Sequence, residues 1–263
     1  MSAEGQAGSK GKVDGTQAIR RAAAILRQIG QSVPQGGDLS AISEAVQLPR
    51  STTHRILQGL VEEELISYDK KARRYFVGRL TYELGLAATG EALGIGHWRP
   101  FVDNVARRTG ATTYLMGRSG IEATCLMKAE SSSVIRVIPV DLGQRRYLGI
   151  GAGATALLAA LDAVESDRII RTIAPYLGQY SSLTEEGVRS MVDETRRTGI
   201  AVSRGNVTEN VIGIGMAIRE GDAPPRLALS LAALAPRDDE ATVEDWKEII
   251  REEVRAGQRA AFG

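Results

Sequence analysis

The stretch LPRSTTHRILQGLVEE, residues 48–63, decides how the N-terminal third of the chain folds. It predicts a helix over residues 51–63, after a break at 47–49, with Ser51 as its N-cap. At 100° per residue the apolar and polar side chains of this helix fall in opposite sectors. The apolar sector consists of Thr53, Ile56, Leu57, Leu60 and Val61, and the polar sector of Ser51, Arg55, Gln58 and Glu62, flanked by Thr52 and His54. One face can therefore pack against neighbouring helices while the other presents hydrogen-bonding groups.

The polar face of this helix has what a helix in the DNA major groove needs. Base edges present donors and acceptors that Arg55 and Gln58 can engage in pairs. Ser51 and Thr52 lie at the helix N-terminus, where free amides favour a phosphate. A simply solvated face is the alternative interpretation, and the helix alone does not decide between the two. The order of the elements around it favours DNA binding.

The surrounding elements follow the order of a winged helix-turn-helix. They are a helix over 16–30 with Thr16 as N-cap and Gly30 at its end, a polar loop with Pro34, Gly36 and Gly37, a helix over 39–46, and strands over 65–68 and 74–77. A polar turn at 69–72 joins the two strands. Four cations at the tip of this hairpin suit a wing that lies along the DNA backbone or in the minor groove. They are Lys70, Lys71, Arg73 and Arg74.

Length, composition and charge set the limits for the rest of the chain. With 263 residues, 43% of them hydrophobic and 25% charged, the chain is long enough for two compact domains. The net charge is +1, and residues 1–91 hold 12 Lys and Arg against 10 Asp and Glu. A slightly basic N-terminal part permits contact with phosphates but does not prove it.

Cysteine content and apolar runs argue against secreted and membrane classes. Cys125 is the single cysteine, so no intrachain disulfide can form, which fits a reducing cytoplasm. No apolar run approaches the ~20 residues of a membrane span. The first residues lack an apolar signal region. We therefore expect a cytoplasmic protein, with residues 1–14 as a disordered, weakly basic tail and not a targeting signal.

The remainder predicts a linking helix and a second domain. The helix is expected over 79–93, with Leu80, Leu84 and Ala88 on one side. In the second domain, strands are expected over 111–118, 121–129, 134–140, 200–204, 211–219 and 226–234, and helices over 98–109, 154–163, 166–176, 184–198 and 242–260. Strands at both ends with helices between them predict an α+β domain built on one mainly antiparallel sheet.

The run Leu48–Leu57, followed by Leu60, Tyr75 and Gly78, resembles the IclR family of bacterial transcriptional regulators. The similarity continues through 149–158, 199–204 and 211–218, and covers nearly all of residues 16–262. It implies a winged helix-turn-helix DNA-binding domain over 15–78, a linker helix over 79–93 and an effector-binding domain with a GAF/PAS-like antiparallel sheet over 94–263. It also implies double-stranded operator DNA, a small organic effector, and assembly as a homodimer or a dimer of dimers.

The resemblance assigns residues to both sites. By position, Arg50, Thr52 and Arg55 match DNA contacts of the family, with Ser51 and His54 beside them; Gln58 of the polar face and Arg74 of the hairpin complete the predicted set. The positions that match the family's effector cavity are Ala152, Gly153, Ser203, Gly213, Ser230 and Ala232. Three of these, Ser203, Gly213 and Ala232, are smaller or less polar than in several members, which predicts a different, bulkier ligand.

The stretch GIGAGA, residues 149–154, is similar to a dinucleotide-binding fingerprint. The residues before it predict no buried strand and Asp167 lies in a polar helix, so the context of that fingerprint is missing. Two interpretations stay open: a glycine turn that packs closely before a helix, and a cradle whose amides bind a carboxylate at the helix N-terminus. Arg145 or Arg146 is the candidate charged partner, although such a pair is more often exposed.

The sequence lacks the parts of a catalytic site. Neither histidine has metal-ligand spacing. Cys125 is expected inside a strand, as part of the hydrophobic core and not as a nucleophile. No nucleophile elbow or P-loop occurs. We expect no metal, no cofactor and no enzymatic activity. A small-molecule-binding enzyme domain fused to a winged-helix interaction module is the alternative, and a nucleoid-type binder is disfavoured by the size of the second domain. The leading hypothesis is a regulator of a catabolic or metabolic operon controlled by a small effector, with repression and activation both open.

Overall fold

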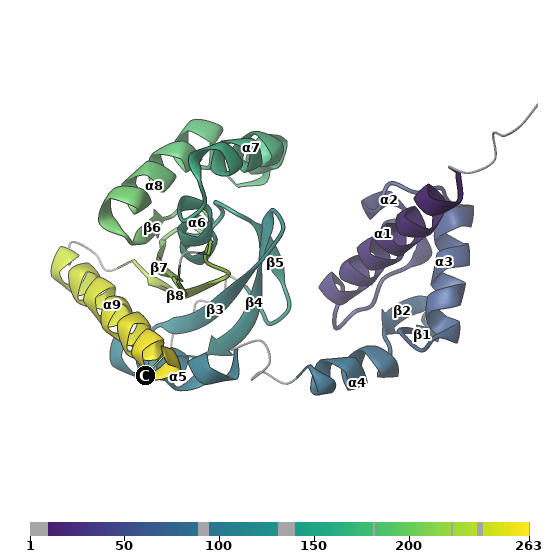
Figure 1. Ribbon diagram of the computed structural model, residues 1–263, viewed down its shortest axis with the longest axis horizontal. Helices are drawn as coiled ribbons and strands as arrows, with labels where there is room; N and C mark the ends of the chain where they lie inside the picture. Colours follow the sequence, from purple (N-terminus) through teal and green to yellow (C-terminus); the bar gives the residue numbers. More distant parts are fainter. Residues whose placement is uncertain are drawn as a thin grey trace, which may run out of the picture. The chain divides into compact units, whose positions relative to one another are not determined.

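The computed structural model describes residues 10–88, 95–130, 140–180, 182–221, 223–235 and 239–262, with side chains from residue 16 to 261. The chain divides into two compact units, Met1–Thr89 and Gly90–Gly263. Figure 1 shows the N-terminal unit in purple and blue and the C-terminal unit from teal to yellow. None of the described helices is both long enough and apolar enough to cross a membrane.

The N-terminal unit is the predicted winged helix-turn-helix. Its elements are α1 (Lys10–Gln31), α2 (Leu39–Ala45), α3 (Arg50–Glu62), the antiparallel hairpin β1 (Ile66–Asp69) and β2 (Arg74–Val77), and α4 (Arg79–Ala87). Three helices and the hairpin enclose one small apolar core. That core consists of Ile25, Ile29, Ile42, Leu57, Leu60, Ile66 and Tyr75. Each aliphatic side chain of this core contributes about 1.5–3 kcal/mol on burial, which makes the cluster a main source of the unit's stability.

Three predicted helix ends are wrong in this unit. Helix α1 begins at Lys10, so residues 10–14, predicted as part of a disordered tail, are helical and Thr16 is not the N-cap. Helix α1 also continues one residue past Gly30, because a single glycine costs a helix only about 1 kcal/mol. Helix α3 begins at Arg50 with Pro49 as the N-cap residue, so Ser51 lies in the first turn and does not cap it.

The glycine-containing loop after α1 packs on the hairpin. Gly37 and Tyr75 exchange two backbone hydrogen bonds, of 2.9 and 2.8 Å, which add a bridge to the outer edge of β2. Gly36 has φ +71°, and a Cβ there would lie 2.6 Å from the Phe76 ring. At the hairpin tip, the Asp69 carboxylate accepts from the amides of Lys71 and Ala72 at 2.7 and 3.0 Å. The wing is thereby tied to the rest of the unit.

Gly78 sets the start of α4. A Cβ on this residue would lie 2.2 Å from the Glu64 carbonyl oxygen and 2.6 Å from the Ile66 amide nitrogen. The Gly78 amide donates to the Leu65 carbonyl at 3.0 Å, and the Thr81 hydroxyl donates to the same carbonyl at 2.7 Å. Helix α4 therefore leaves the hairpin from a fixed point. It ends at Ala87 and not at residue 93, and residues 89–94 of the predicted linker lie outside the described residues.

The C-terminal unit is the predicted α+β domain on an antiparallel sheet. Its strands are β3 (Thr112–Ser119), β4 (Glu122–Ala129), β5 (Arg145–Tyr147), β6 (Ala201–Arg204), β7 (Val211–Ile218) and β8 (Leu227–Leu234), in the order β5-β4-β3-β8-β7-β6. Its helices are the 3-10 helix η1 (Gly96–Trp98), α5 (Arg99–Thr109), α6 (Ala152–Ala159), α7 (Ala163–Ile173), the 3-10 helix η2 (Ala174–Gln179), α8 (Glu185–Thr198) and α9 (Glu240–Phe262). Every described strand pairing is antiparallel.

Helices cover both faces of this sheet, with α6, α7 and α8 over one face and α5 and α9 over the other (Figure 1). Because side chains alternate along a strand, the sequences VIGIGMAI and LALSLAAL send large residues to one face and small residues to the other. Large residues such as Ile212, Ile214 and Leu229 join the core under α5 and α9. Small residues such as Ala228 and Ala232 face α6, so this helix lies close to the sheet.

Some predicted elements of this unit need correction. The strand predicted over 134–140 falls almost entirely on residues 131–139, which lie outside the described part of the chain. The sequence predicted no strand at 145–147, where three half-buried residues form β5 along β4. Helix α6 begins at Ala152, two residues before its predicted start, and ends at Ala159 instead of 163.

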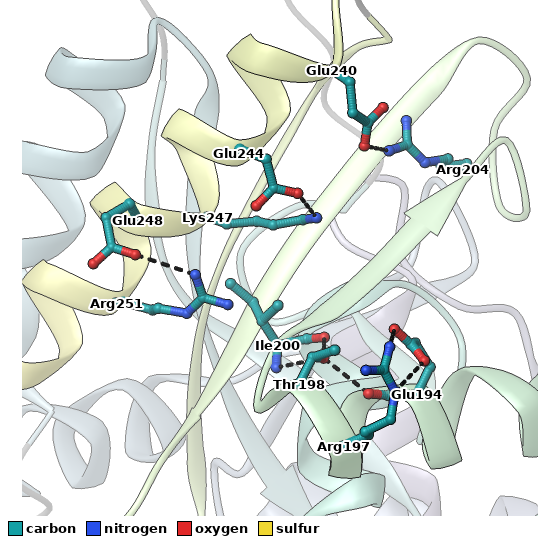
Figure 2. A network of polar contacts seen from close by, with 10 residues as sticks. All are labelled: Glu194, Arg197, Thr198, Ile200, Arg204, Glu240, Glu244, Lys247, Glu248 and Arg251. Carbon is teal, nitrogen blue, oxygen red and sulfur yellow. Dashed lines mark hydrogen bonds and ion pairs between the residues drawn. The ribbon is translucent and has the colours of Figure 1, made fainter.

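Ion pairs run along α9 and beside it (Figure 2). Lys247 pairs with Glu244 at 2.5 Å and Arg251 with Glu248 at 3.2 Å, each three residues apart. Arg204 of β6 reaches Glu240 at the start of the helix, at 2.6 Å. Each pair at helical spacing stabilises the helix by only about 0.2–0.5 kcal/mol, so the pattern mainly fixes where the long side chains lie.

Replacing Gly78 with alanine tests the attachment of α4. The new methyl group would overlap the Glu64 carbonyl, so we expect Gly78→Ala to lower the free energy of unfolding by about 1–3 kcal/mol. Gly85→Ala is the control, because a Cβ at Gly85 meets nothing within 4 Å and alanine is the better helix former. Urea unfolding followed by circular dichroism measures both. Equal stability of the two variants would show that α4 starts elsewhere.

Candidate DNA-binding face and effector cavity

The polar sector of α3 is exposed, as the sequence predicted. Ser51, His54, Arg55 and Gln58 are exposed and Thr52 is half-buried. On the opposite side Thr53, Leu57 and Leu60 are buried. Among the described residues no hydrogen bond or ion pair engages the side chains of Arg50, Arg55 or Gln58, and these groups are open to a ligand.

Charge is unevenly distributed along α3. Arg50 and Arg55 lie in its first half, and Glu62 and Glu63 lie at its C-terminal end. The side chain of Asp38 caps α2 by accepting from the Ala41 amide at 2.9 Å. That hydrogen bond is the main reason why the pKa of this carboxyl is lowered, with smaller effects from Arg74 and Arg50. Because the two arginines of α3 lie in its first half and its glutamates at the other end, the N-terminal half is the part suited to base edges and phosphates.

Arg74 has a structural role that the sequence did not indicate. Its guanidinium donates to the carbonyl oxygens of Gln35 and Gly36, at 3.3 and 2.8 Å. These bonds hold the loop after α1 against β2. A DNA contact by Arg74 would have to use its remaining donors, and this contact stays a prediction.

The second candidate site is a cavity at the N-terminus of α6. All six predicted positions, from Ala152 to Ala232, line this one cavity, together with residues of β3, β5 and the loop after β6. About 60 Å³ of it is open to the centre of a water molecule, several times the space that one water needs. The first amide groups of α6, at Ala152, Gly153 and Ala154, have no intrahelical acceptor. They border a small, partly enclosed space.

Close packing and the cavity are two aspects of the same arrangement. Gly149 and Gly151 have φ of +93° and +83°, which favours glycine at both positions. A Cβ on Gly153 would lie 2.7 Å from the Ser230 hydroxyl oxygen, and one on Gly215 would lie 2.8 Å from the Ala152 carbonyl carbon. The glycines therefore bring the end of α6 onto the sheet, and the interpretation as a packing turn holds for Gly153. A valine there would disturb packing before it touched a ligand.

Space at Gly213 is taken by the protein itself. A Cβ on Gly213 would lie 3.3 Å from the Ala152 Cβ. The small residue at this position accommodates α6, and the expectation of a bulkier ligand gains no support from it. Ser203 and Ser230 are both nearly buried. The Ser203 hydroxyl has a long contact, 3.4 Å, with the Asn206 amide oxygen. No hydrogen bond to another described residue engages the Ser230 hydroxyl.

The two candidate arginines have different surroundings. Arg145 pairs with Glu122 at 2.7 Å and donates to the Ser119 hydroxyl at 2.6 Å. Arg146 lines the cavity, with a guanidinium nitrogen 4.0 Å from the position that a Cβ on Gly151 would take. Burial lowers the pKa of Arg146, and the nearby hydroxyl groups of Tyr180 and Tyr114 partly oppose this shift. Among the described residues that line the cavity, Arg146 is therefore the cation.

Sequence reasoning missed part of the cavity wall. Tyr114 and Met116 of β3, together with Val207 and Thr208 of the loop after β6, complete it. Burial raises the pKa of the Tyr114 hydroxyl, so this group stays protonated at neutral pH. The two residues of β3 alternate around Leu115, which packs under α5 and α9. That alternation was a usable signal, but the sequence did not show which face α6 would cover.

No catalytic group emerges from the described residues. Cys125 is buried beneath α6–α8, and burial raises its pKa to about 11, so its thiol is protonated at neutral pH. Among the residues described, no group of three or more His, Cys, Asp and Glu side chains is arranged to hold a metal ion.

A winged helix with an open polar face, joined to a domain with an internal cavity, defines the class of effector-responsive DNA-binding regulators. Comparison with protein families agrees. Residues 18–70 match the IclR helix-turn-helix domain and residues 95–258 match the C-terminal domain of bacterial transcriptional regulators of the IclR type. The chain belongs to the IclR family. It is a transcriptional regulator with a DNA-binding helix-turn-helix and a ligand-binding C-terminal domain.

Curated relatives carry the same description. The chain is 30% identical to the HTH-type transcriptional regulator Rv1719 of Mycobacterium tuberculosis over 238 residues. The matched region covers 90% of this chain and 88% of that protein. It is 29% identical over 209 residues to the regulator TtgV of Pseudomonas putida, a region that covers 78% of this chain and 76% of that protein. The repressor AllR of Klebsiella pneumoniae is 26% identical over 246 residues. Relatives named as regulators and repressors confirm that the chain is not an enzyme, and the fused-enzyme alternative is wrong.

Solved structures share the fold. An IclR transcriptional regulator from Alicyclobacillus acidocaldarius superposes with a TM-score of 0.76 at 24% identity, covering 92% of this chain and 98% of that one. An IclR regulator from Silicibacter sp. TM1040 gives a TM-score of 0.80 at 20% identity, covering 94% and 96%. These likenesses confirm the predicted architecture of helix-turn-helix and effector domain.

Proposed function

We propose that this regulator controls a catabolic or metabolic operon in the cytoplasm and responds to a small organic acid bound at the N-terminus of α6. The observation that carries the proposal is the cavity itself. It combines one half-buried cation, the free amides of a helix end and an open serine hydroxyl around a space of small-molecule size. Repression and activation are equally compatible with this arrangement.

The chemistry of the cavity favours a carboxylate. Arg146 is half-buried at the wall of the cavity, where an anion beside its guanidinium would gain a charge-assisted hydrogen bond. The amides of Gly153 and Ala154 point out of the first turn of α6, where the helix dipole also favours negative charge. Ser230 can orient a second oxygen. The apolar part of the wall, including Met116, Ile150 and Val207, suits the carbon skeleton of the acid.

One fold neighbour was solved with a carboxylate ligand. A homologue from Microbacterium hydrocarbonoxydans, 20% identical to this chain with a TM-score of 0.69, was solved in complex with 4-hydroxybenzoate. That ligand is a compact acid with an apolar ring. For the present chain the class of ligand rests on Arg146 and the end of α6, and not on the neighbour.

The DNA-binding part of the proposal rests on α3. Arg50, Ser51, Thr52, His54, Arg55 and Gln58 would contact operator DNA, with Arg74 beside the tip of the wing. Arg55 and Gln58 lie one turn apart on the exposed face and suit base edges, while Arg50 suits a phosphate beside the groove. A single winged helix covers few base pairs, so we infer a homodimer or a dimer of dimers on a repeated site.

The exposed side of α4 supplies a surface for such a dimer. Leu84 is 55% exposed, and Tyr82 and Leu86 are 66% and 61% exposed. Of the predicted stripe, Leu84 and Ala88 are exposed and Leu80 is half-buried. An effector can change DNA affinity only if it favours one arrangement of the paired DNA-binding domains over another, and a dimer through α4 would couple the two.

Replacing Arg55 with alanine should abolish selective operator binding. The loss of a bidentate base contact costs about 1–3 kcal/mol, and it should also relax sequence preference. Arg168→Ala on the exposed side of α7 removes the same charge and is the control. Fluorescence anisotropy with the operator and with a scrambled duplex measures both. Unchanged affinity and preference in Arg55→Ala would refute this role.

Replacing Arg146 with glutamine should weaken acid binding by about tenfold or more, because one charge-assisted contact is lost. The control is Arg145→Gln on the same strand, whose guanidinium faces Glu122 and not the cavity. A thermal-shift screen of aromatic and aliphatic acids identifies the ligand, since binding to the native state raises the melting temperature. Calorimetry then gives the affinities. Equal binding by both variants would place the effector outside this cavity.

A charge on α4 should break the proposed dimer. We expect Leu84→Asp to sediment as a monomer at concentrations where the wild-type chain is at least dimeric, because the carboxylate would be buried without a partner. Leu142→Asp places the same charge on a leucine that is 58% exposed in the effector domain. If the wild-type chain is itself monomeric with and without operator DNA, the assembly proposal fails.

A further inference from the structure

A second cleft lies on the other side of α6, where the edge of the sheet is stepped. Strand β6 pairs with β7 only as far as Ala201 opposite Gly215. Met216 and Ala217 of β7 continue the pairing with β8 but have no described strand on their outer side. The cleft occupies this notch, between the C-terminal halves of α6, α8 and α9. About 300 Å³ of it is open to the centre of a water molecule, compared with 60 Å³ in the effector cavity.

Three guanidinium groups from three different segments line this cleft. Arg196 comes from α8, Arg219 follows the end of β7, and Arg255 comes from α9. Gln258, one turn beyond Arg255, completes the polar wall and donates to the Arg219 carbonyl at 2.6 Å. Of the described residues that line the cleft, none is an aspartate or a glutamate. The arrangement therefore concentrates positive charge.

The carboxylate that would match Arg255 is bound elsewhere. Along α9, Lys247 and Arg251 each pair with the glutamate three residues before them (Figure 2). By the same spacing Arg255 would pair with Glu252. Glu252 instead accepts from Arg108 of α5 at 2.7 Å. Within the described part of the chain, neither Arg255 nor Arg219 forms an ion pair, so both guanidinium groups are open to an anion.

Arg196 is held in place by the helix that it faces. It donates to the carbonyl oxygens of Ala159 and Leu161 at 3.2 and 3.4 Å, at the C-terminal end of α6. Its remaining terminal nitrogen is 3.6 Å from an oxygen of Asp193, beyond a good hydrogen bond. Arg196 is therefore pre-positioned at the rim, while Arg219 and Arg255 are exposed and adaptable.

The floor of the cleft keeps room for an occupant. Ala156 and Ala160 of α6, Gly199 after α8 and Ala217 of β7 line it with small side chains. Guanidinium groups suit oxyanions, because their planar donors can contact two oxygens at once. Three such groups around a small-walled space match a compact anion with several oxygens better than an apolar ligand.

We propose that this cleft is a second ligand site, distinct from the effector cavity, and that it binds a compact oxyanion with at least two negative charges. Phosphoryl groups and dicarboxylates share this chemistry. Arg219 and Arg255 supply the variable contacts, and Arg196 supplies a fixed charge. The site does not depend on the organic-acid proposal, because no residue lines both spaces.

Calorimetric titration of the full-length chain with inorganic phosphate and with succinate, at low ionic strength, tests the proposal. Low salt is required because exposed charges are screened over about 10 Å at 0.1 M. We expect one of the two anions to bind, and the double variant Arg219→Gln, Arg255→Gln to weaken that binding by at least about tenfold. Whichever anion binds more tightly identifies the phosphoryl or the carboxylate class.

Two controls distinguish anion binding in this cleft from a general effect of surface charge and from binding in the effector cavity. Arg259→Gln removes an exposed charge one turn further along α9 and should leave binding unchanged. Arg146→Gln, in the effector cavity, should also leave it unchanged. Absence of binding to the wild-type chain, or equal loss in the Arg259 variant, would overturn the proposal. Loss in the Arg146 variant alone would assign the anion to the effector cavity. If the double variant changes the sedimentation of the chain instead of anion affinity, the cleft is an interface between copies and the proposal is wrong.

Discussion

The arrangement of the effector domain depends on how closely α6 approaches the sheet. Gly215 and Gly153 lie where any side chain would overlap the opposing element, with Cβ positions 2.8 Å from the Ala152 carbonyl carbon and 2.7 Å from the Ser230 hydroxyl. All eight residues of α6 are buried. Larger residues at these positions would push α6 away from the sheet. The gap that this leaves would cost the core both dispersion contacts and apolar burial, because protein interiors are densely packed. The small-residue face of β7 and β8 therefore fixes where the helix starts and what its first turn faces.

The position of α6 explains why polar groups meet at one point. Its first turn lies against the serine of β8, and Gly151, with positive φ, directs the chain beneath Arg146 of β5. The other end of the helix carries Ala159, whose carbonyl binds Arg196. One short helix thus presents amides to one cavity and carbonyls to a cleft. The N-terminus of α6 carries a partial positive charge and its C-terminus a partial negative charge. This difference accounts for the free amide donors at the N-terminus and for the arginine that caps the C-terminus.

Much of this arrangement could be predicted from the sequence, and the failures have physical causes. The polar and apolar sectors of α3 follow from 3.6-residue periodicity, and six cavity positions follow from resemblance to the family. Element ends were less reliable. Helix α3 starts at Arg50, with Pro49 and not Ser51 as its N-cap residue. The three-residue strand β5 before α6 was not predicted, and Arg146 was named only as one of two candidate cations. Which arginine faces inward depends on strand register, and register is set by pairing with β4. A single sequence does not contain that information directly.

The second cleft, lined by three arginines, is the part of the structure that the sequence predicts least. Its three arginines, Arg196, Arg219 and Arg255, span about 60 positions of the chain and share no motif, so no spacing rule connects them. They meet because β6 is shorter than β7 and because Arg108 takes the carboxylate that α9 offers at helical spacing. Both causes are tertiary. Since α6 contacts both spaces and is packed between them, a ligand that shifts it at one end alters the surroundings of the other. Coupling of this kind requires a helix with two discrete positions, and the close approach of Gly153 and Gly215 to the opposing elements holds α6 in a single one.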